Sequence, residues 1–164
     1  MRIVHLLLTS HFAGTERHVL ELAAAQAAAG HDVSLVLRRA AGQPRADAIA
    51  QRVDPKVKIV WVGDLFSAWQ ARRVVQRLSP DVAHAHLSKA CHALRGLRGP
   101  SLRVATLHIR YKAGQHRALD GLIAIAPWQL AAIPEPLRAH SVQIDNWTIP
   151  HVAANDARER LRAA

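Results

Sequence analysis

Residues 1–39 read MRIVHLLLTSHFAGTERHVLELAAAQAAAGHDVSLVLRR, and this stretch decides the fold. The nearly unbroken apolar run over residues 2–9 predicts a strand that is covered on both faces. A turn with one glycine follows, and then an amphipathic helix that we expect to begin near Thr15, as its N-cap, and to stop at Gly30. Residues 33–37 form the next predicted strand. In open α/β sheets, ligands bind where such a loop joins the carboxyl end of a strand to a helix N-terminus, and the helix amides there favour phosphate.

Strands and helices alternate over the rest of the chain. Further strands are predicted at residues 57–62, 82–86, 103–108, 122–126 and 141–145. Helices are predicted at residues 46–51, 67–78, 88–97 and 128–138. Two prolines break the last of these helices, and Trp69 is expected to point inward from the helix at 67–78. This alternation predicts an α/β fold, a Rossmann-like open parallel sheet of about seven strands with helices on both faces.

The composition is that of one globular domain. Half of the 164 residues are apolar and only 21% are charged, which excludes a disordered chain. The single cysteine, Cys91, cannot form an intrachain disulfide, and this favours a reducing compartment. The opening apolar run is too short for a signal peptide or a membrane span, so we expect a cytoplasmic protein. The formal net charge of +10 indicates either anionic partners or a solvated arginine-rich surface.

Histidines lie at the ends of two successive predicted strands. His84 and His86 are two residues apart on one strand and therefore share a face. A metal site would need a third ligand, for which Cys91 or His92 is available, but the spacing matches no common structural zinc site. We therefore expect no metal, with His84 packed in the core and His86 at the strand end. His108 ends the next strand, at the edge of the sheet where sites lie.

Five short motifs occur in order along the chain: AGTERH at 13–18, PDVAHAH at 80–86, TLH at 106–108, GLIAIA at 121–126 and IDNW at 144–147. Together they resemble the N-terminal domain of glycosyltransferase family 4, whose members are retaining enzymes with the GT-B fold. The resemblance covers residues 1 to about 150. The chain departs from the family pattern at Ala13, which replaces a glycine, and at Asp145 and Trp147, which replace the proline and glycine of a P-N-G segment.

The resemblance implies transfer of a sugar from a nucleotide-sugar donor to a carbohydrate or lipid-linked acceptor, with biosynthesis of lipopolysaccharide or another envelope glycan as the expected setting. His108 is implied as the catalytic residue, pointing into the cleft near the transferred sugar. The donor phosphate is expected at Gly14, Thr15, Glu16 and Arg17. The acceptor is expected at His86, Ser88, Lys89, Arg110 and Lys112. No metal or other cofactor is expected, because amides and cations meet the leaving diphosphate.

In this family a second Rossmann-like domain binds the nucleotide sugar and carries an E-x7-E motif. This sequence has no such pair, since its glutamates are Glu16, Glu21, Glu135 and Glu159. We expect residues 1–150 to be the N-terminal, acceptor-side domain and residues 151–164 to begin a linker and a truncated C-terminal domain. Alone, the chain is expected to be inactive in this EC 2.4 class of reaction and to need the missing donor domain. Its basic surface suits a peripheral position on the inner face of the membrane.

Three other functions fit parts of the sequence. A non-catalytic domain that binds an anionic glycan or lipid, or a subunit of a two-chain transferase, would use the same residues. A nucleic-acid-binding protein is disfavoured, because one tyrosine and two phenylalanines supply few stacking platforms. A dinucleotide-dependent oxidoreductase is disfavoured, because no G-x-G-x-x-G follows the first strand and the second strand ends in Leu-Arg-Arg rather than in an acidic ribose ligand.

Overall fold

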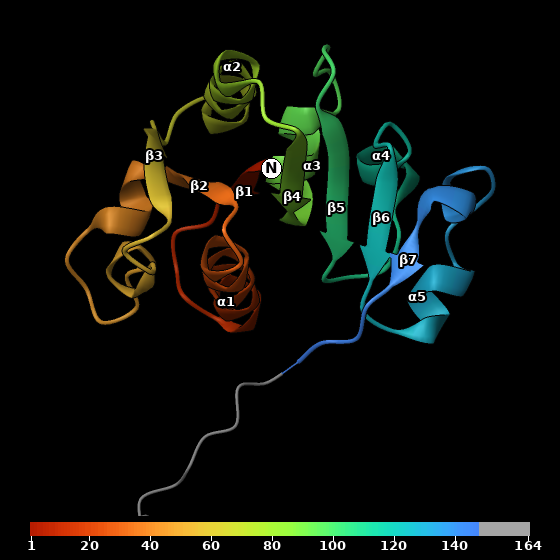
Figure 1. Ribbon diagram of the computed structural model, residues 1–164, viewed down its shortest axis with the longest axis horizontal. Helices are drawn as coiled ribbons and strands as arrows, with labels where there is room; N and C mark the ends of the chain where they lie inside the picture. Colours follow the sequence, from red (N-terminus) through yellow and green to blue (C-terminus); the bar gives the residue numbers. More distant parts are fainter. Residues whose placement is uncertain (148–164) are drawn as a thin grey trace, which may run out of the picture.

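The computed structural model describes residues 1–147, which form a seven-stranded parallel sheet with flanking helices. The strand order is β3-β2-β1-β4-β5-β6-β7 (Figure 1). The strands are β1 Arg2–Leu7, β2 Asp32–Arg38, β3 Lys58–Val62, β4 Val82–His86, β5 Leu102–Leu107, β6 Gly121–Ala124 and β7 Val142–Gln143. The Rossmann-like parallel sheet predicted from the alternation of elements is therefore confirmed. The predicted start of a second domain at 151–164 lies outside the residues that the structure describes.

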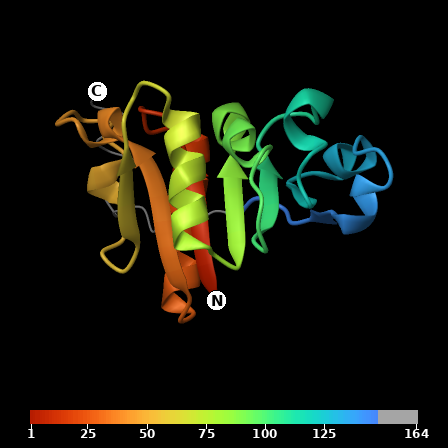
Figure 2. The same ribbon diagram turned by 90° about the horizontal axis from the view of Figure 1, so that it is seen from above.

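β1 lies inside the sheet, with β2 and β3 on one side of it and β4 to β7 on the other. It pairs in parallel with β2 on one side and with β4 on the other. Figure 2 shows the strand arrows pointing to one edge, with the N-terminus at the opposite edge. Because the strand order reverses between β1 and β4, the topological switch point lies at the carboxyl ends of these two strands.

Helices cover both faces of the sheet. α1 (Gly14–Ala28) packs on one face, whereas α2 (Ser67–Leu78) and α3 (Leu87–Leu94) pack on the other (Figure 1). Side chains alternate along each strand, so Leu6 belongs to the core under α2 and α3 and Leu7 belongs to the core under α1. The predicted helical cover of both faces is confirmed.

Shorter helical segments complete the connections: α4 Ala113–His116, α5 Pro127–Ala131, η1 Arg39–Gly42, η2 Ala50–Arg52 and η3 Leu137–His140. The helix predicted at 46–51 does not form. The carbonyl oxygen of Asp47 accepts a hydrogen bond from the Phe12 N–H at 3.0 Å, and its carboxylate contacts His11 at 2.7 Å. These bonds hold the segment against the loop before α1 and compete with helical bonds.

The start of α1 also differs from the prediction. Ala13 is the N-cap, so the prediction of Thr15 at this position is wrong. The buried carboxylate of Glu16 accepts hydrogen bonds from the Ala13 N–H at 3.0 Å and from the Thr9 hydroxyl at 2.7 Å. It therefore supplies one half of a capping box. Gly30 follows the helix with a φ of 87°, which confirms its predicted role as a stop.

α2 spans the predicted residues, but one of its side chains points the other way. Trp69 is 57% exposed, so its predicted inward orientation is wrong. Ala71 and Val75 form the buried face of the helix. The guanidinium of Arg73 lies over the exposed Trp69 ring at 5.0 Å, which gives the indole a partner outside the core.

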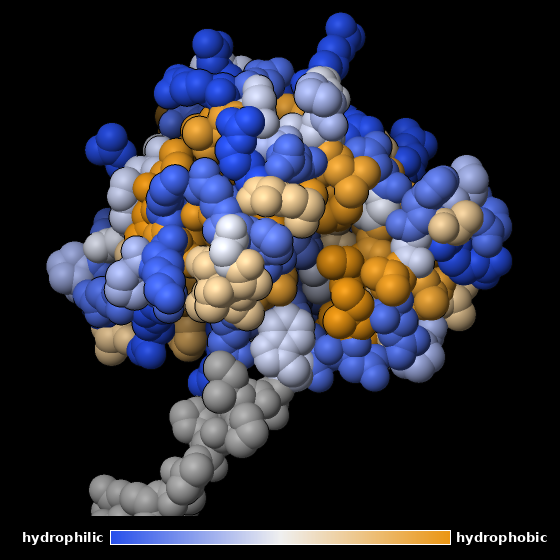
Figure 3. Space-filling model, viewed as in Figure 1, coloured by the Kyte–Doolittle hydropathy of each residue, from blue (hydrophilic) through white to orange (hydrophobic). Residues whose placement is uncertain are grey.

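Among residues 1–147, exposed apolar side chains gather at two places. The first is the loop before α2 and the first turn of that helix, with Leu65, Phe66 and Trp69. The second is on α5, on β7 and just after it, with Trp128, Val142 and Ile144. Figure 3 shows apolar residues, in orange, gathered where Figure 1 places β6, β7 and α5. Within residues 1–147, the structure contains no helix with the length and apolar character needed to cross a membrane.

Candidate functional site

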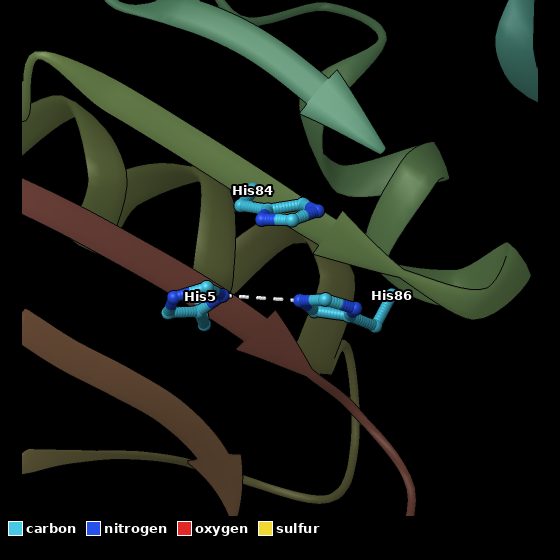
Figure 4. A group of neighbouring side chains, drawn as sticks. All are labelled: His5, His84 and His86. Carbon is cyan, nitrogen blue, oxygen red and sulfur yellow. Dashed lines mark hydrogen bonds between the residues drawn. The ribbon is translucent and has the colours of Figure 1, made fainter. Parts of the chain in front are cut away.

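Three histidines meet at the switch point of the sheet. His5 on β1 lies directly opposite His84 on β4, and His86 lies two residues farther along β4. Figure 4 shows the three rings close together on these neighbouring strands. His5 Nδ1 lies 3.0 Å from His86 Nε2, and the ring centroid of His84 lies 5.1 Å from that of His5 and 4.3 Å from that of His86. All three side chains are buried, so imidazoles take the place of aliphatic side chains in this part of the core.

A chain of hydrogen bonds runs from α1 through two of these rings to the carboxyl edge of the sheet. The Gln26 carbonyl oxygen, Oε1, accepts from His5 Nε2–H at 2.7 Å. A neutral imidazole has one donor and one acceptor, so His5 Nδ1 accepts from His86 Nε2–H. His86 Nδ1 in turn accepts from His108 Nε2–H at 3.2 Å. This order of donors leaves Nδ1 of His108 as a hydrogen-bond acceptor.

Burial keeps the histidine cluster uncharged. It lowers the pKa of His5 from 6.5 to about 4 and lowers the pKa of both His84 and His86 well below 6.5. Repulsion between neighbouring histidines adds to the effect of desolvation. The half-buried His108 behaves in the same way, because desolvation and then the charge of His18 lower its pKa to about 4. At neutral pH the cluster therefore acts through neutral rings.

The metal-free protein is expected to lose stability as the pH falls from about 6.5 toward 4. An unfolded histidine takes up a proton near pH 6.5, whereas His5 takes it up only near 4 and His84 and His86 take it up well below 6.5, so the unfolded state binds more protons in this window. The free energy of unfolding should fall by about 1.4 kcal/mol per pH unit for each buried histidine. Urea unfolding across the window measures the slope. The control variant His140→Gln, at an exposed histidine, should leave this slope unchanged. A free energy of unfolding that does not change with pH across the window would contradict a neutral histidine cluster.

The N-terminal part of α1 lies beside His108. The ring of His18 is 5.0 Å from that of His108, edge to face, and 4.5 Å from that of Trp147. A Cβ built on Gly14 would meet no atom within 4 Å, and the φ of Gly14 is not positive. Neither packing nor turn conformation therefore requires this glycine, which leaves open space at the first amides of the helix.

The four residues predicted to bind the donor phosphate divide into two kinds. Gly14 and Arg17 are exposed, and Thr15 is partly exposed, so all three are accessible to a ligand. Glu16 is buried, and its carboxylate accepts the capping hydrogen bonds described above. The prediction that Glu16 binds phosphate is corrected, because its carboxylate caps the helix and would repel an anion.

A hollow of about 550 Å³ lies at the same edge of the sheet, between the starts of α2, α3 and α4. Its lining includes the predicted acceptor residues Ser88 and Lys89, together with Phe66, His92 and Gln115. The Ser88 hydroxyl donates to Gln115 Oε1 at 3.0 Å, which ties α3 to the segment after β5.

The other predicted acceptor residues lie elsewhere. Arg110 and Lys112 are exposed on the loop between β5 and α4 and do not line the hollow. His86 is fully buried, and both of its nitrogens are engaged by His5 and His108. Its predicted direct contact with the acceptor is therefore corrected: His86 holds His108 and does not itself reach the surface.

Comparison with known proteins agrees with this arrangement of strands. The sequence profile described as Glycosyltransferase Family 4 matches residues 12–149, which is most of the chain. The chain belongs to glycosyltransferase family 4. No curated protein matches the sequence at a significant level.

Solved glycosyltransferases share the fold of this family 4 domain. A glycosyltransferase from Rickettsia africae ESF-5 superposes with a TM-score of 0.61 at 12% identity, over 88% of this chain and 42% of that one. The lipopolysaccharide outer core galactosyltransferase WaaB, in its apo form, superposes with a TM-score of 0.59 at 11% identity, over 89% of this chain and 46% of WaaB. The family 4 domain thus spans less than half the length of either protein, and it has the fold of a GT-B N-terminal half.

Three residues of the histidine cluster and its surroundings were not singled out by the sequence analysis: His5, Gln26 and Thr106. His5 lies inside an apolar run that reads as a buried strand, and only its pairing opposite His84 reveals a cluster. Gln26 lies in an alanine-rich part of α1 and bonds to His5. Thr106 lies within the TLH motif, and its hydroxyl is 2.8 Å from His84 Nε2. The expected strand order could have revealed the cluster. In sheets whose strand order reverses at this point, β1 and β4 are neighbours, so His5 and His84 lie on adjacent strands.

Proposed function

We propose that this family 4 domain is the acceptor-side half of a retaining glycosyltransferase that moves a sugar from a nucleotide sugar to a carbohydrate or lipid-linked acceptor in envelope glycan biosynthesis. The observation that carries the proposal is that His108, the open first turn of α1 and the hollow all lie at the carboxyl edge of the sheet. In α/β sheets this edge, at the switch point, is where ligands bind. Membership in family 4 supports glycosyl transfer as the chemistry.

Each part of this edge has a task in such a reaction. Transfer leaves negative charge on a diphosphate, and the amides after Gly14 together with the Arg17 cation would stabilise it without a metal. The neutral His108 would accept a hydrogen bond at Nδ1 from a hydroxyl of the transferred sugar or acceptor. Ser88 and Lys89 would hold polar or anionic groups of the acceptor in the hollow.

The test is reconstitution with the donor-binding C-terminal domain of a family 4 relative, across a panel of nucleotide sugars. We expect transfer from the mixture or from a fusion of the two parts, and none from residues 1–164 alone, which carry no E-x7-E motif. No transfer with both parts folded and docked would favour a non-catalytic domain that binds an anionic glycan or lipid. Docking is checked by sedimentation before activity is scored.

We further propose that the surface beside the hollow rests on an anionic membrane, where a lipid-linked acceptor would be presented. Leu65 and Phe66 are each 72% exposed, and Trp69 follows in the first turn of α2. The cations Arg73 and Lys89 lie next to this apolar group, since Arg73 stacks on Trp69 and Lys89 lines the hollow with Phe66. Apolar side chains beside cations are the combination that binds a negatively charged bilayer surface.

Vesicle co-sedimentation tests this placement. We expect binding to vesicles that contain phosphatidylglycerol, little binding to pure phosphatidylcholine, and weakening by salt. Trp69→Gln should lower the affinity for these vesicles roughly tenfold, because the variant has no indole at this position to enter the membrane interface. Trp128→Gln is the matched control, since Trp128 is 58% exposed at the other end of the sheet. Equal losses in both variants would argue against a membrane face at α2.

A further inference from the structure

We propose that His5, His84 and His86 form a buried site for a divalent late transition-metal ion, of which Zn²⁺ is the expected occupant. Each residue offers one ring nitrogen, and these nitrogens all lie within 4.8 Å of one another. In a tetrahedral zinc site with Zn–N bonds of about 2.0–2.1 Å, neighbouring nitrogens are about 3.4 Å apart. His5 Nδ1 and His86 Nε2 are already 3.0 Å apart, close to this spacing, and the His84 ring lies beside both of the other rings (Figure 4).

The outer nitrogen of each ring has a partner. His5 Nε2 is bonded to Gln26 Oε1, His84 Nε2 to the Thr106 hydroxyl, and His86 Nδ1 to His108 Nε2. The inward-facing set is therefore His5 Nδ1, His84 Nδ1 and His86 Nε2. Metal-ligating histidines characteristically use their second nitrogen in this way, which orients the ring and raises its affinity for the ion.

The strands also hold the ligands in place before any ion arrives. His5 and His84 are paired across β1 and β4, the two strands of the switch point, and the rings are buried among packed side chains. Burial disfavours protonation, which removes one competitor of the metal, since only a neutral imidazole binds an ion. The three side chains therefore lose their conformational entropy when the protein folds, and this loss does not weaken the binding of the ion.

The donor set selects the class of ion. Three imidazoles and no carboxylate suit Zn²⁺, Cu²⁺ or Ni²⁺ and do not suit Mg²⁺ or Ca²⁺, which prefer oxygen ligands. Three neutral ligands leave both positive charges of the ion uncompensated. The fourth position is therefore expected to hold a hydroxide or another small anion.

An ion at this site would reverse the direction of the hydrogen bonds that reach His108. Once His86 Nε2 ligates the metal, the remaining proton of His86 sits on Nδ1 and is donated to His108 Nε2. His108 then carries its own proton on Nδ1 and changes from an acceptor to a donor at the edge of the sheet. The tautomer of His108 thus reports whether the buried site is loaded.

The first experiment uses the whole chain after treatment with a chelator. Titration with Zn²⁺, followed by gel filtration and metal analysis, should give one ion per chain and a higher melting temperature. Co²⁺ should give the intense visible absorption of a tetrahedral ion, and Mg²⁺ should do nothing. Failure to retain one Zn²⁺ per chain at micromolar concentrations would overturn the proposal.

Variants then locate the ion. His5→Gln and His84→Gln should each lower Zn²⁺ affinity roughly 100-fold or more, and Gln26→Ala should lower it about 10- to 100-fold as an outer partner. His116→Gln is the matched control, because His116 is also buried but bonds to the Lys112 N–H outside the cluster. Zn²⁺ affinity that survives in folded His5→Gln and His84→Gln would overturn the site.

A measurement on the wild-type chain removes the dependence on variants that fail to fold. Nitrogen-15 NMR of the histidine rings distinguishes protonated, unprotonated and metal-bound nitrogens. We expect Zn²⁺ to shift one nitrogen each of His5, His84 and His86 and to move the proton of His108 from Nε2 to Nδ1. Zn²⁺-dependent shifts confined to exposed histidines, such as His140, would show binding at the surface and overturn the proposal.

Discussion

Replacing His108 by alanine is expected to lower kcat/KM of the reconstituted transferase by roughly 100- to 1,000-fold. His108 directly follows β5 and lies beside the N-terminal part of α1, with its ring 5.0 Å from that of His18 and its Nε2 bonded to His86. Its Nδ1 is therefore held in one place as an acceptor. Alanine removes this acceptor and leaves His86 Nδ1 without a donor, so both substrate positioning and the local hydrogen bonds are lost.

Two comparisons separate this role from a structural one. His108→Asn keeps a polar side chain and should recover part of the activity if its amide can replace the imidazole. His140→Ala, at an exposed histidine of η3, should leave kcat/KM unchanged. Urea unfolding of every variant shows whether the fold is intact. Full activity in a folded His108→Ala protein would remove His108 from the catalytic site.

Gly121→Ala is expected to lower the free energy of unfolding by about 3 kcal/mol. Gly121 begins β6, and a Cβ at this position would collide with the carbonyl oxygen of His140 in η3. The carbonyl cannot move aside easily, because the next residue, Ser141, donates its hydroxyl to the Leu137 carbonyl oxygen at 2.8 Å and accepts from the Leu122 N–H at 3.2 Å. One methyl group must therefore displace the segment that leads into β7.

Gly114→Ala is the control for this substitution. A Cβ on Gly114 meets no atom within 4 Å, and its φ is not positive, so alanine fits without strain. Since Gly114 lies in α4, alanine should even stabilise the chain slightly. Urea unfolding compares the two variants with the wild-type chain. Equal stability of the two variants would mean that η3 yields to Gly121→Ala at little cost.

The strands were predictable because their apolar runs are long and are bounded by polar segments. β4 has the predicted bounds, and the other strands lie within or close to theirs. A strand covered on both faces leaves this signal in the sequence whatever packs against it. α2 was predictable from a different local signal. Its apolar residues recur at helical spacing, and this period predicts a helix over 67–78, as observed.

The failures share a cause, which is a tertiary contact that local sequence does not carry. Residues 46–51 have helical composition, but Asp47 bonds to His11 and Phe12 across 35 residues of chain or more. Thr15 is a good N-cap residue, yet the Glu16 carboxylate performs the capping from inside the first turn. Trp69 is apolar by type and still lies outside, where Arg73 covers one face of its ring.

The position of the edge histidine was predictable, and the buried cluster behind it was not. His108 was singled out from its place at a predicted strand end, and the structure places it at the carboxyl edge beside α1, while its catalytic role stays a prediction. The buried cluster was missed because the sequence was searched for a third ligand near His84 and His86, whereas that partner, His5, lies on a strand 79 residues earlier in the chain. Periodicity along one strand cannot reveal what lies across the sheet.

The position of β1 inside the sheet has a consequence for the order of events during synthesis. Residues 2–7 are synthesised before either of their partner strands and can pair with β2 as soon as residues 32–38 follow. The opposite edge of β1 stays open until residues 82–86 emerge, so a row of unpaired amides and carbonyls is exposed while residues 39–81 are being made. Nascent chains that stall in this interval should be the ones that recruit chaperones or aggregate.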